Sequence, residues 1–367
     1  MMEWSPQQRE ALNDVYHWLK KKNGSRMFRL FGFAGTGKST LAKEIAANVD
    51  GSTIFMAYTG KASLVMRNNG CRGASTIHSF IYRPKEDVNT GKVTFDFHFN
   101  EQVAEASLII VDEVSMVGED IGRDLLKFGV KILVLGDPFQ LPPISGSGFF
   151  INDNPNIMLT EIHRQALNSP IIRMSMDIRE GRNLINDYGD CKVIDRMELT
   201  NDELLKADQV LCGTNRTRKA MNEKIRMLKG MAEFGRPWIP KVGDKLICIK
   251  NNHKKGTLNG SLWTIDSIKG NQIYDMGVKS IDGDSDNIVE IKVPVEFFMG
   301  KEDEMPWRER KGFDEFTFGY TITVHKGQGS QWDNVVVIDE SGAFGENSAR
   351  HLYTAITRAA SKVIVAV

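Results

Sequence analysis

The residues with the clearest chemical meaning form an eight-residue stretch near the start of the chain. Its sequence, GFAGTGKS from Gly32 to Ser39, fits the phosphate-binding loop pattern G-x-x-x-x-G-K-[ST]. The glycines allow successive backbone N–H groups to point into one concavity, and the positive end of the following helix dipole adds to that field. We therefore expect a polyphosphate here, with Lys38 at the β- and γ-phosphates and the Ser39 hydroxyl on Mg²⁺. A plain strand-to-helix turn would need the glycines but not the Lys-Ser pair that follows them.

A second group of reactive side chains follows the apolar run SLIIVDEVSM at 107–116. Mg²⁺ bound at a phosphate loop needs a carboxylate at the carboxyl end of a neighbouring strand, and Asp112 has that position. Glu113 beside it is suited to polarise an attacking water, which favours hydrolysis over phosphate transfer to a second substrate. A third apolar run ends in the polar cluster that contains Gln140. Open α/β sheets bind their ligands at this edge.

Length and composition set limits on the molecule that carries these groups. The 367 residues exceed what one compact core usually holds, so two or more domains are expected. There are 47 Lys plus Arg and 47 Asp plus Glu, so net charge neither suggests nor excludes nucleic acid. The sequence has no secretory leader and no 18-residue apolar run, which predicts a cytoplasmic protein.

Four isolated cysteines, without a C-x-x-C pair, argue against a zinc ribbon, an iron–sulfur cluster or a disulfide framework. This usage fits a reducing, intracellular environment. The four residues are Cys71, Cys191, Cys212 and Cys248.

The elements that must position the phosphate loop begin with an amphipathic helix over 5–20. Ser5 caps it and Pro6 takes the first helical position. Gln8 completes an S-x-x-Q capping box, which is a structural role that leaves a ligand contact open as well.

Two stretches break the alternation of strands and helices. The first, at 82–105, is a predicted β-hairpin whose VTFDFHF segment places Phe97 and Phe99 on one side. These rings either pack the hairpin against its parent domain or stack on bases. The second, at 236–311, contains short alternating stretches and reads as a small SH3-like all-β insert.

The remaining sequence has α/β texture and predicts two domains. The first covers 1–165, and the second combines 166–235 with 312–367. Each domain carries one of the two β insertions described above.

Eight motifs in order support a resemblance. The set GFAGTGKST, TGKAS, STIHSF, IIVDEVSM, LGDPFQLPPI, LTEIHRQ, TVHKGQGSQWDNVVV and YTAITRA covers nearly the whole chain. It resembles the superfamily 1 helicases and is most similar to their RecD/Dda-like branch, whose members move 5′ to 3′ on single-stranded DNA. The resemblance implies an α/β fold of two RecA-like P-loop NTPase domains with ATP in the cleft between them.

The resemblance also implies roles for single residues. Gln8 lies where the adenine contact is found, Asp112 orients Mg²⁺ and Glu113 acts as the base. Gln140 senses the γ-phosphate, while Arg164 and Arg358 reach it as arginine fingers. The nucleotide-binding set is Gln8, Gly35, Thr36, Gly37, Lys38, Ser39 and Thr40. The DNA-binding set is Thr59, Lys61, His78, Thr323 and His325, together with the hairpin rings Phe97 and Phe99.

These residues predict an ATP-dependent DNA helicase with ATP and Mg²⁺ as cofactors. We expect it to bind single-stranded DNA and ss/ds DNA junctions as a monomer. Single-strand-binding or replication proteins are the expected protein partners. A single-strand translocase that displaces bound proteins uses the same chemistry and stays open. A kinase would not need Glu113 beside Asp112, and a GTPase should show an N-K-x-D base reader, which the sequence lacks. A non-enzymatic DNA-binding subunit would not need Lys38.

Overall fold

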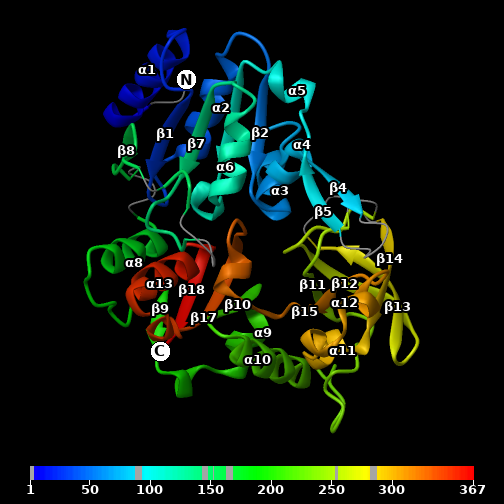
Figure 1. Cartoon of the computed structure of the whole chain (residues 1–367). Coiled ribbons are helices and arrows are strands. Elements are labelled where there is room, and N and C mark those ends of the chain that lie inside the picture. The colour runs from blue at the N-terminus through cyan, green and yellow to red at the C-terminus, as the bar shows by residue number, and fades with distance from the viewer. Residues whose placement is uncertain are drawn as a thin grey trace. The chain divides into compact units, whose positions relative to one another are not determined.

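The computed structural model of the chain consists of two compact units, Met1–Arg182 and Asn183–Val367 (Figure 1). It describes residues 4–86, 93–142, 148–151, 153–162, 168–252, 255–281 and 287–367. The break after Arg182 differs from the predicted boundary at 165, because helix α8 (Pro170–Arg179) is grouped with the first unit. Among the described helices, none is both long and apolar enough to cross a membrane.

The first unit is built on a six-stranded parallel sheet. Its strand order is β3 (Ser75–Thr76), β2 (Thr53–Ala57), β6 (Leu108–Asp112), β7 (Ile132–Gly136), β1 (Met27–Gly32) and β8 (Ile157–Leu159). All neighbouring pairs run parallel. The helices of this unit are α1 (Pro6–Lys20), α2 (Lys38–Ala47), α3 (Gly60–Asn68), α4 (Ile77–Ile81), α5 (Glu101–Ala104), α6 (Glu119–Leu126) and α8, with a short 3-10 turn η1 (Val114–Met116).

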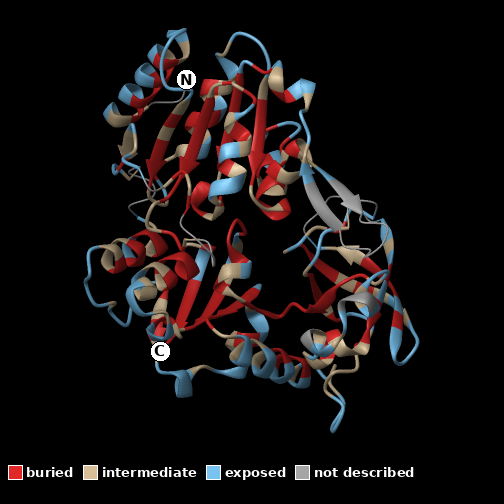
Figure 2. Cartoon of the chain, in the orientation of Figure 1, coloured by how far each residue is buried: buried red, intermediate tan, exposed pale blue. Residues whose placement is uncertain are grey.

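The strands of this sheet are apolar on both faces. Along β7, Leu133 and Leu135 pack into one core cluster, while Ile132 and Val134 pack into the other. Successive side chains of a strand point to opposite faces, so a continuous apolar run is what a sheet covered on both sides requires. The buried interior is visible as the red strands at the centre of the unit in Figure 2.

The parallel arrangement brings the carboxyl ends of β1, β7, β6 and β2 to one edge of the sheet. The strand β7 lies between β6 and β1. The segments that follow these ends are the phosphate loop after β1 and the Asp112-Glu113 pair at the end of β6. The phosphate loop and the two acids therefore lie at the same edge of the parallel sheet.

The second unit contains a five-stranded parallel sheet with the order β16 (Thr321–Thr323), β10 (Gln209–Cys212), β17 (Trp332–Ile338), β18 (Ala359–Ala366) and β9 (Lys192–Ile194). All neighbouring strands again run parallel. Its helical elements are η2 (Arg196–Glu198), α9 (Asn201–Lys206), α10 (Asn215–Leu228), η4 (Val324–Gly327), η5 (Ser341–Asn347) and α13 (Ser348–Ile356).

An antiparallel sheet is inserted between α10 and β16. Its order is β14 (Ile288–Pro294), β13 (Ile273–Ser280), β12 (Leu262–Lys269), β11 (Lys245–Cys248) and β15 (Phe316–Phe318), accompanied by α11 (Val295–Met299), η3 (Glu302–Glu304) and α12 (Trp307–Arg310). The predicted end of this insert at 311 is too early, because β15 pairs with β11. The strand pairing continues to Phe318, and the chain returns to the parallel sheet only at β16. An SH3-like barrel stays a prediction.

The segment predicted as a hairpin contains β4 (Tyr82–Glu86) and β5 (Val93–Phe97), which pair antiparallel. Residues 87–92, between these two strands, lie outside the described residues. After β5 the chain passes into the short helix α5 and then into β6.

Candidate functional site

The phosphate loop joins β1 to α2 through two glycines in the left-handed region. Gly35 has φ 78° and Gly37 has φ 83°, where a side chain would be strained. Lys38 opens α2, and its Nζ donates to the carbonyl oxygens of Gly32 at 2.7 Å and Phe33 at 3.0 Å. Thr40 follows in the first turn, with its N–H donating to Gly37 O at 3.1 Å. The loop thus holds the lysine ammonium against its own carbonyls at the start of α2.

Gln8 connects helix α1 to this loop. Its side chain is 2% exposed. The amide oxygen accepts from Ser5 N at 3.1 Å, which completes the predicted capping box. The amide nitrogen donates to Thr36 O in the phosphate loop at 3.1 Å. Both ends of the amide are therefore used within the protein, and its adenine contact stays a prediction.

Gln7 is a positioning residue that sequence analysis missed. Its side-chain oxygen accepts from Thr160 N and Glu161 N, both at 2.9 Å, and its nitrogen donates to Met158 O at 3.0 Å. This amide fixes the start of α1 to the end of β8. The partners lie about 150 residues away in sequence, so only the adjacency of two glutamines in the first helical turn offered a signal.

Ser39 and Asp112, both predicted to hold Mg²⁺, lie close to each other. The Ser39 Oγ lies 3.5 Å from Asp112 Oδ2. The pKa of Asp112 is raised to about 6, chiefly because its carboxylate is desolvated and secondly because the Glu113 carboxylate lies beside it. Lys38 and Ser39 act in the opposite direction. A hydroxyl and a carboxylate are oxygen donors of the type that Mg²⁺ prefers. The residues present therefore fit this ion.

Glu113 has an unusual backbone. Among the described residues it is the one non-glycine residue with positive φ, at φ 54° and ψ 44°. Its N–H donates to Asp112 Oδ1 at 2.8 Å. A non-glycine residue in this region costs about 1 kcal/mol or more, and such strain gathers at functional sites. The strained turn sets the direction in which Glu113 leaves the end of β6.

Gln140 follows β7, the strand between those of Asp112 and the phosphate loop. Its side chain is buried. The preceding turn is closed by Asp137, whose carboxylate accepts from Phe139 N at 3.0 Å and whose carbonyl accepts from Gln140 N at 3.2 Å. The structure thus brings Gln140 to the same sheet edge as the loop and the two acids.

The DNA-binding residues predicted in the first unit also share this edge, after β2 and β3. Thr59 caps α3, with its hydroxyl accepting from Ala62 N at 3.1 Å, which is a structural role. Lys61 is buried in the same helix. The ring of His78 in α4 lies 6.0 Å from Tyr58 and 5.4 Å from Tyr82. Contact with DNA stays a prediction for all three predicted residues.

The two hairpin rings differ in their surroundings. Phe97 is half-buried, with its ring centroid 5.5 Å from Phe128 and the Lys127 ammonium 4.9 Å from its centroid. Phe99 stacks on the same Phe128 ring at 5.3 Å and 19°, yet it is 54% exposed. Phe97 therefore packs the strand onto its own domain, whereas Phe99 keeps a large solvent-facing surface.

The predicted residues of the second unit lie around β16 and α13. Thr323 caps η4, with its hydroxyl accepting from Lys326 N at 3.4 Å. Burial lowers the pKa of His325, whose ring lies 5.7 Å from Phe344. Arg358 is 6% exposed, and its guanidinium donates to Thr354 O and Ser330 O, both at 3.2 Å. Arg164 lies outside the described residues.

A buried imidazole beside His325 was not anticipated. His351 is fully buried and stacks on Phe344 at 4.0 Å and 14°. Neither ring nitrogen has a hydrogen-bond partner among the residues that the structure describes. Burial, followed by the nearby His325, lowers the pKa of His351 to about 4, so this ring is neutral near pH 7. Its place one turn before Tyr353-Thr354-Ala355 was the available signal.

Comparison with known proteins agrees with this geometry. A family model described as AAA domain matches residues 3–198, more than half of the chain, and one described as UvrD-like helicase C-terminal domain matches 318–366. The second match begins at the last residue of β15, close to the corrected boundary.

Several known proteins are similar to the chain, among them two relatives and one solved structure. The ATP-dependent RecD2 DNA helicase of Deinococcus radiodurans is 28% identical over 366 residues, covering 92% of this chain and 46% of its own length. The ATP-dependent DNA helicase Pif1 of Bdellovibrio bacteriovorus is 22% identical over 379 residues, covering 91% and 81%. A structure of two coordinating Pif1 helicases at forked double-stranded DNA shares the fold, with a TM-score of 0.63, 19% identity, and coverage of 100% and 92%. The chain spans about half the length of the RecD2 relative.

Proposed function

We propose that this chain is an ATP-dependent DNA helicase that moves 5′ to 3′ on single-stranded DNA. The chain belongs to the AAA-domain family, and we place it among the RecD- and Pif1-like helicases of superfamily 1. The observation that carries the proposal is the convergence of Lys38, Ser39, Asp112, Glu113 and Gln140 at the carboxyl edge of one parallel sheet. The named relatives are ATP-dependent DNA helicases, which supports the same conclusion.

The chemical step follows from the residues at this edge. The phosphate loop and Lys38 bind the β- and γ-phosphates, and Ser39 with Asp112 holds Mg²⁺, which neutralises charge on the phosphate oxygens when bound. Glu113, fixed by its strained turn, orients and deprotonates the attacking water. Gln140 registers whether the γ-phosphate is present.

Movement requires that hydrolysis depend on the arrangement of two domains. We assign this role to Arg358, and to Arg164, as arginine fingers that complete the site when the domains close around ATP. Closure and reopening then carry Thr59, Lys61 and His78 past Thr323 and His325 along the DNA backbone. A substrate of DNA also implies an intracellular place of action.

A single-strand translocase that displaces bound proteins remains a second candidate. One observation favours it: of the two roles left open for the Phe97 ring, packing and base stacking, its contact with Phe128 of its own domain supports packing. Under the helicase proposal, the exposed Phe99 carries the base-stacking contact.

The test compares Lys38→Ala with Lys43→Ala, which removes an exposed lysine from the same helix α2. ATP turnover with and without single-stranded DNA, and strand separation of duplexes with a 5′ or a 3′ tail, are measured on each. We expect DNA-stimulated turnover and 5′-tail unwinding in the parent and in Lys43→Ala. Lys38→Ala should lose both and still bind single-stranded DNA.

Three outcomes separate the alternatives. Turnover by a folded Lys38→Ala protein at the parent rate would overturn the site assignment. DNA-stimulated turnover without unwinding of either tailed duplex would favour the translocase. Unwinding of the 3′-tailed duplex alone would reverse the polarity while leaving the helicase intact.

A further inference from the structure

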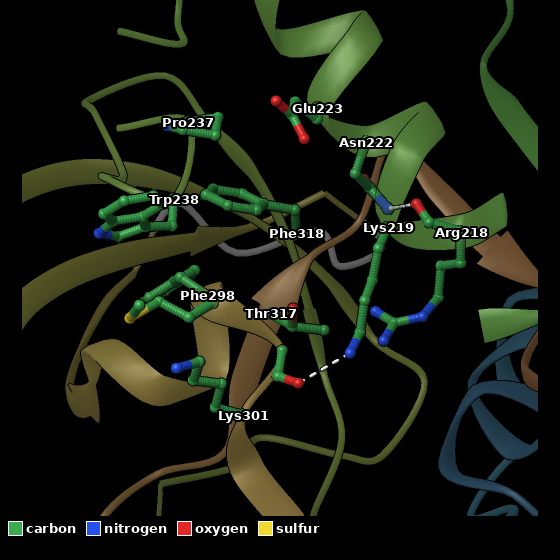
Figure 3. Close-up of a pocket in the computed structure, with 12 residues that line it drawn as sticks. Arg218, Lys219, Asn222, Glu223, Pro237, Trp238, Phe298, Lys301, Thr317 and Phe318 are labelled. Carbon is green, nitrogen blue, oxygen red and sulfur yellow. Dashed lines mark hydrogen bonds between the residues drawn. The ribbon is translucent and has the colours of Figure 1, made fainter. Parts of the chain in front are cut away.

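A pocket of about 360 Å³ lies within the second unit, between α10, α11 and β15 (Figure 3). None of its lining residues belongs to the nucleotide-binding or DNA-binding sets described above. The pocket therefore needs a separate explanation.

One end of the pocket is aromatic. Phe298 and Phe318 are buried, with ring centroids 5.0 Å apart and planes tilted by 49°, and the half-buried Trp238 lies on the same side in Figure 3. The Arg226 guanidinium carbon lies 3.9 Å from the centroid of Phe318 and covers one of its faces. Because these two phenyl rings are tilted and one is covered, they do not form a parallel slot for a base. They suit a single apolar side chain.

Basic side chains also line the pocket. Three basic side chains and one carboxylate line the pocket, which leaves a local charge of three minus one, or +2. Arg218 and Lys219 lie opposite Trp238 in Figure 3. The Lys219 ammonium donates to Gly300 O at 2.7 Å, which fixes it at the end of α11 and leaves further donors on the same nitrogen. The third cation is Lys301 and the carboxylate is Glu223.

An exposed aromatic ring lies in the turn that leads to the aromatic end of the pocket. The turn Glu233–Arg236 is closed by Arg236 N donating to Glu233 O at 3.1 Å, and it leads directly to Pro237 and Trp238. Phe234 stands at the tip of this turn and is 103% exposed. A fully exposed aromatic ring next to a pocket is typical of a protein-binding surface.

We propose that this pocket binds an acidic segment of a partner protein that carries one aromatic or large aliphatic side chain. The side chain enters the aromatic end, and neighbouring carboxylates contact Arg218, Lys219 and Lys301. The whole chain has a net charge of zero, so this excess of cations is local and selects an anionic partner by complementarity. Phe234 adds apolar contact at the rim.

The first experiment measures anisotropy of a fluorescein-labelled peptide of alternating Asp and Glu with one Phe at its centre. The intact chain should bind it saturably. Lys301→Glu and Arg218→Glu should each weaken binding at least about tenfold, which is 1.4 kcal/mol. Lys224→Glu reverses a charge on the same helix α10 outside this pocket and should change it little. Peptides with Ser for the Phe, or Gln for the acids, should bind weakly.

A second set of variants tests the aromatic end and the identity of the ligand. Trp238→Ala should abolish peptide binding while Trp238→Phe retains most of it, with circular dichroism confirming that both are folded. DNA-stimulated ATP turnover should be unchanged in Lys301→Glu. Absence of saturable peptide binding overturns the proposal, as does an equal loss in Lys224→Glu and Lys301→Glu. Displacement of the peptide by oligo-dT, with a matching loss of oligo-dT affinity in Lys301→Glu, would assign the pocket to nucleic acid instead.

Discussion

At the level of single residues, the strongest physical signal at the nucleotide site is the backbone of Glu113. Its left-handed conformation at φ 54° is retained although glutamate has no steric reason to adopt it. The direction of the side chain, at the end of β6 and next to Asp112, is what this strain maintains. Strain that persists beside a reactive group points to a functional constraint.

This strain gives a prediction in which stability and activity change in opposite directions. Glycine adopts φ near +54° without a Cβ clash, so Glu113→Gly should stabilise the fold by about 1 kcal/mol. The same change removes the base, and turnover should fall by about 10²-fold or more. Glu113→Gln is the matched control, since it keeps the strain and loses the carboxylate. Denaturant unfolding and ATP turnover measure both quantities, and equal stability of the Gly and Gln variants would refute the strain argument.

Arg358 calls for two readouts. As a finger it acts where charge develops in the transition state, so Arg358→Ala should lower the catalytic rate by about 10³-fold with little change in nucleotide affinity. Its guanidinium also donates to Thr354 O and Ser330 O, so the truncation should cost about 1–3 kcal/mol of stability by leaving these carbonyls without this donor. Arg358→Lys keeps the charge and separates the two effects. Equal loss of affinity and rate in the folded variant would make Arg358 a ground-state contact.

The elements show which features sequence could predict. The octet Gly32–Ser39 was recognisable because its glycines and its Lys-Ser pair serve a local backbone geometry. The end of the all-β insert was not recognisable, because the segments FTF and TIT show the same alternation. Only the pairing of β15 with β11 shows that FTF belongs to the inserted sheet. Gln7 was missed for the same reason: its backbone partners at β8 are distant in sequence.

Helix α1 illustrates how such distant contacts support the site. At its start, Gln7 and Gln8 bind backbone groups of the β8 end and of the phosphate loop. At its end, the Lys131 ammonium donates to the carbonyls of Trp18, Leu19 and Lys21. A cation on the last carbonyls of a helix stabilises it through both hydrogen bonds and the helix dipole. The helix is therefore fixed at both ends to elements that carry the nucleotide site.

Phe97 at the end of β5 and Phe99 just after it differ in burial and can be tested separately. Phe97→Ala should lower thermal stability, by about 1–2 kcal/mol for a half-buried ring, and should reduce unwinding and ATP turnover together. Phe99→Ala should leave stability nearly unchanged and reduce unwinding more than DNA-stimulated ATP turnover. Phe99→Trp keeps an aromatic face and should retain unwinding. A parallel loss of both activities in Phe99→Ala would show that this ring only packs on Phe128.

At the scale of the whole chain, the second unit must hold an inserted antiparallel sheet against a parallel one. Asn222 holds α10, which precedes the insert, to β16, which follows it, donating to Thr321 O at 2.8 Å and accepting from Thr321 N at 3.1 Å. The larger connection is a buried ion pair between Arg226 of α10 and Asp244, which precedes β11. Both side chains are fully buried. We infer that this buried ion pair serves to hold α10 and β11 in one arrangement.

The final prediction concerns this ion pair. Arg226 Nε and Nη2 donate to Asp244 Oδ1 at 2.8 Å and Oδ2 at 2.9 Å, and Asp244 also accepts from Tyr320 OH at 3.1 Å and Lys241 N at 2.7 Å. Asp244→Ala leaves a buried guanidinium without its counter-charge, so it should cost about 3–5 kcal/mol. The Arg226→Met and Asp244→Ala double variant should cost less than the sum of the two single variants, because it removes both charges.

Urea unfolding of the three variants, with proteolysis of the segment 229–241 as a local readout, measures this coupling. Asp244→Ala should expose the segment to protease below the concentration of urea that unfolds the first unit, because α10 and β11 are no longer held together. Lys206→Met, which breaks the exposed pair with Asp202, is the control and should change stability by less than about 1 kcal/mol. Strictly additive losses in the double variant would show that Arg226 and Asp244 act through their backbone partners and not through each other.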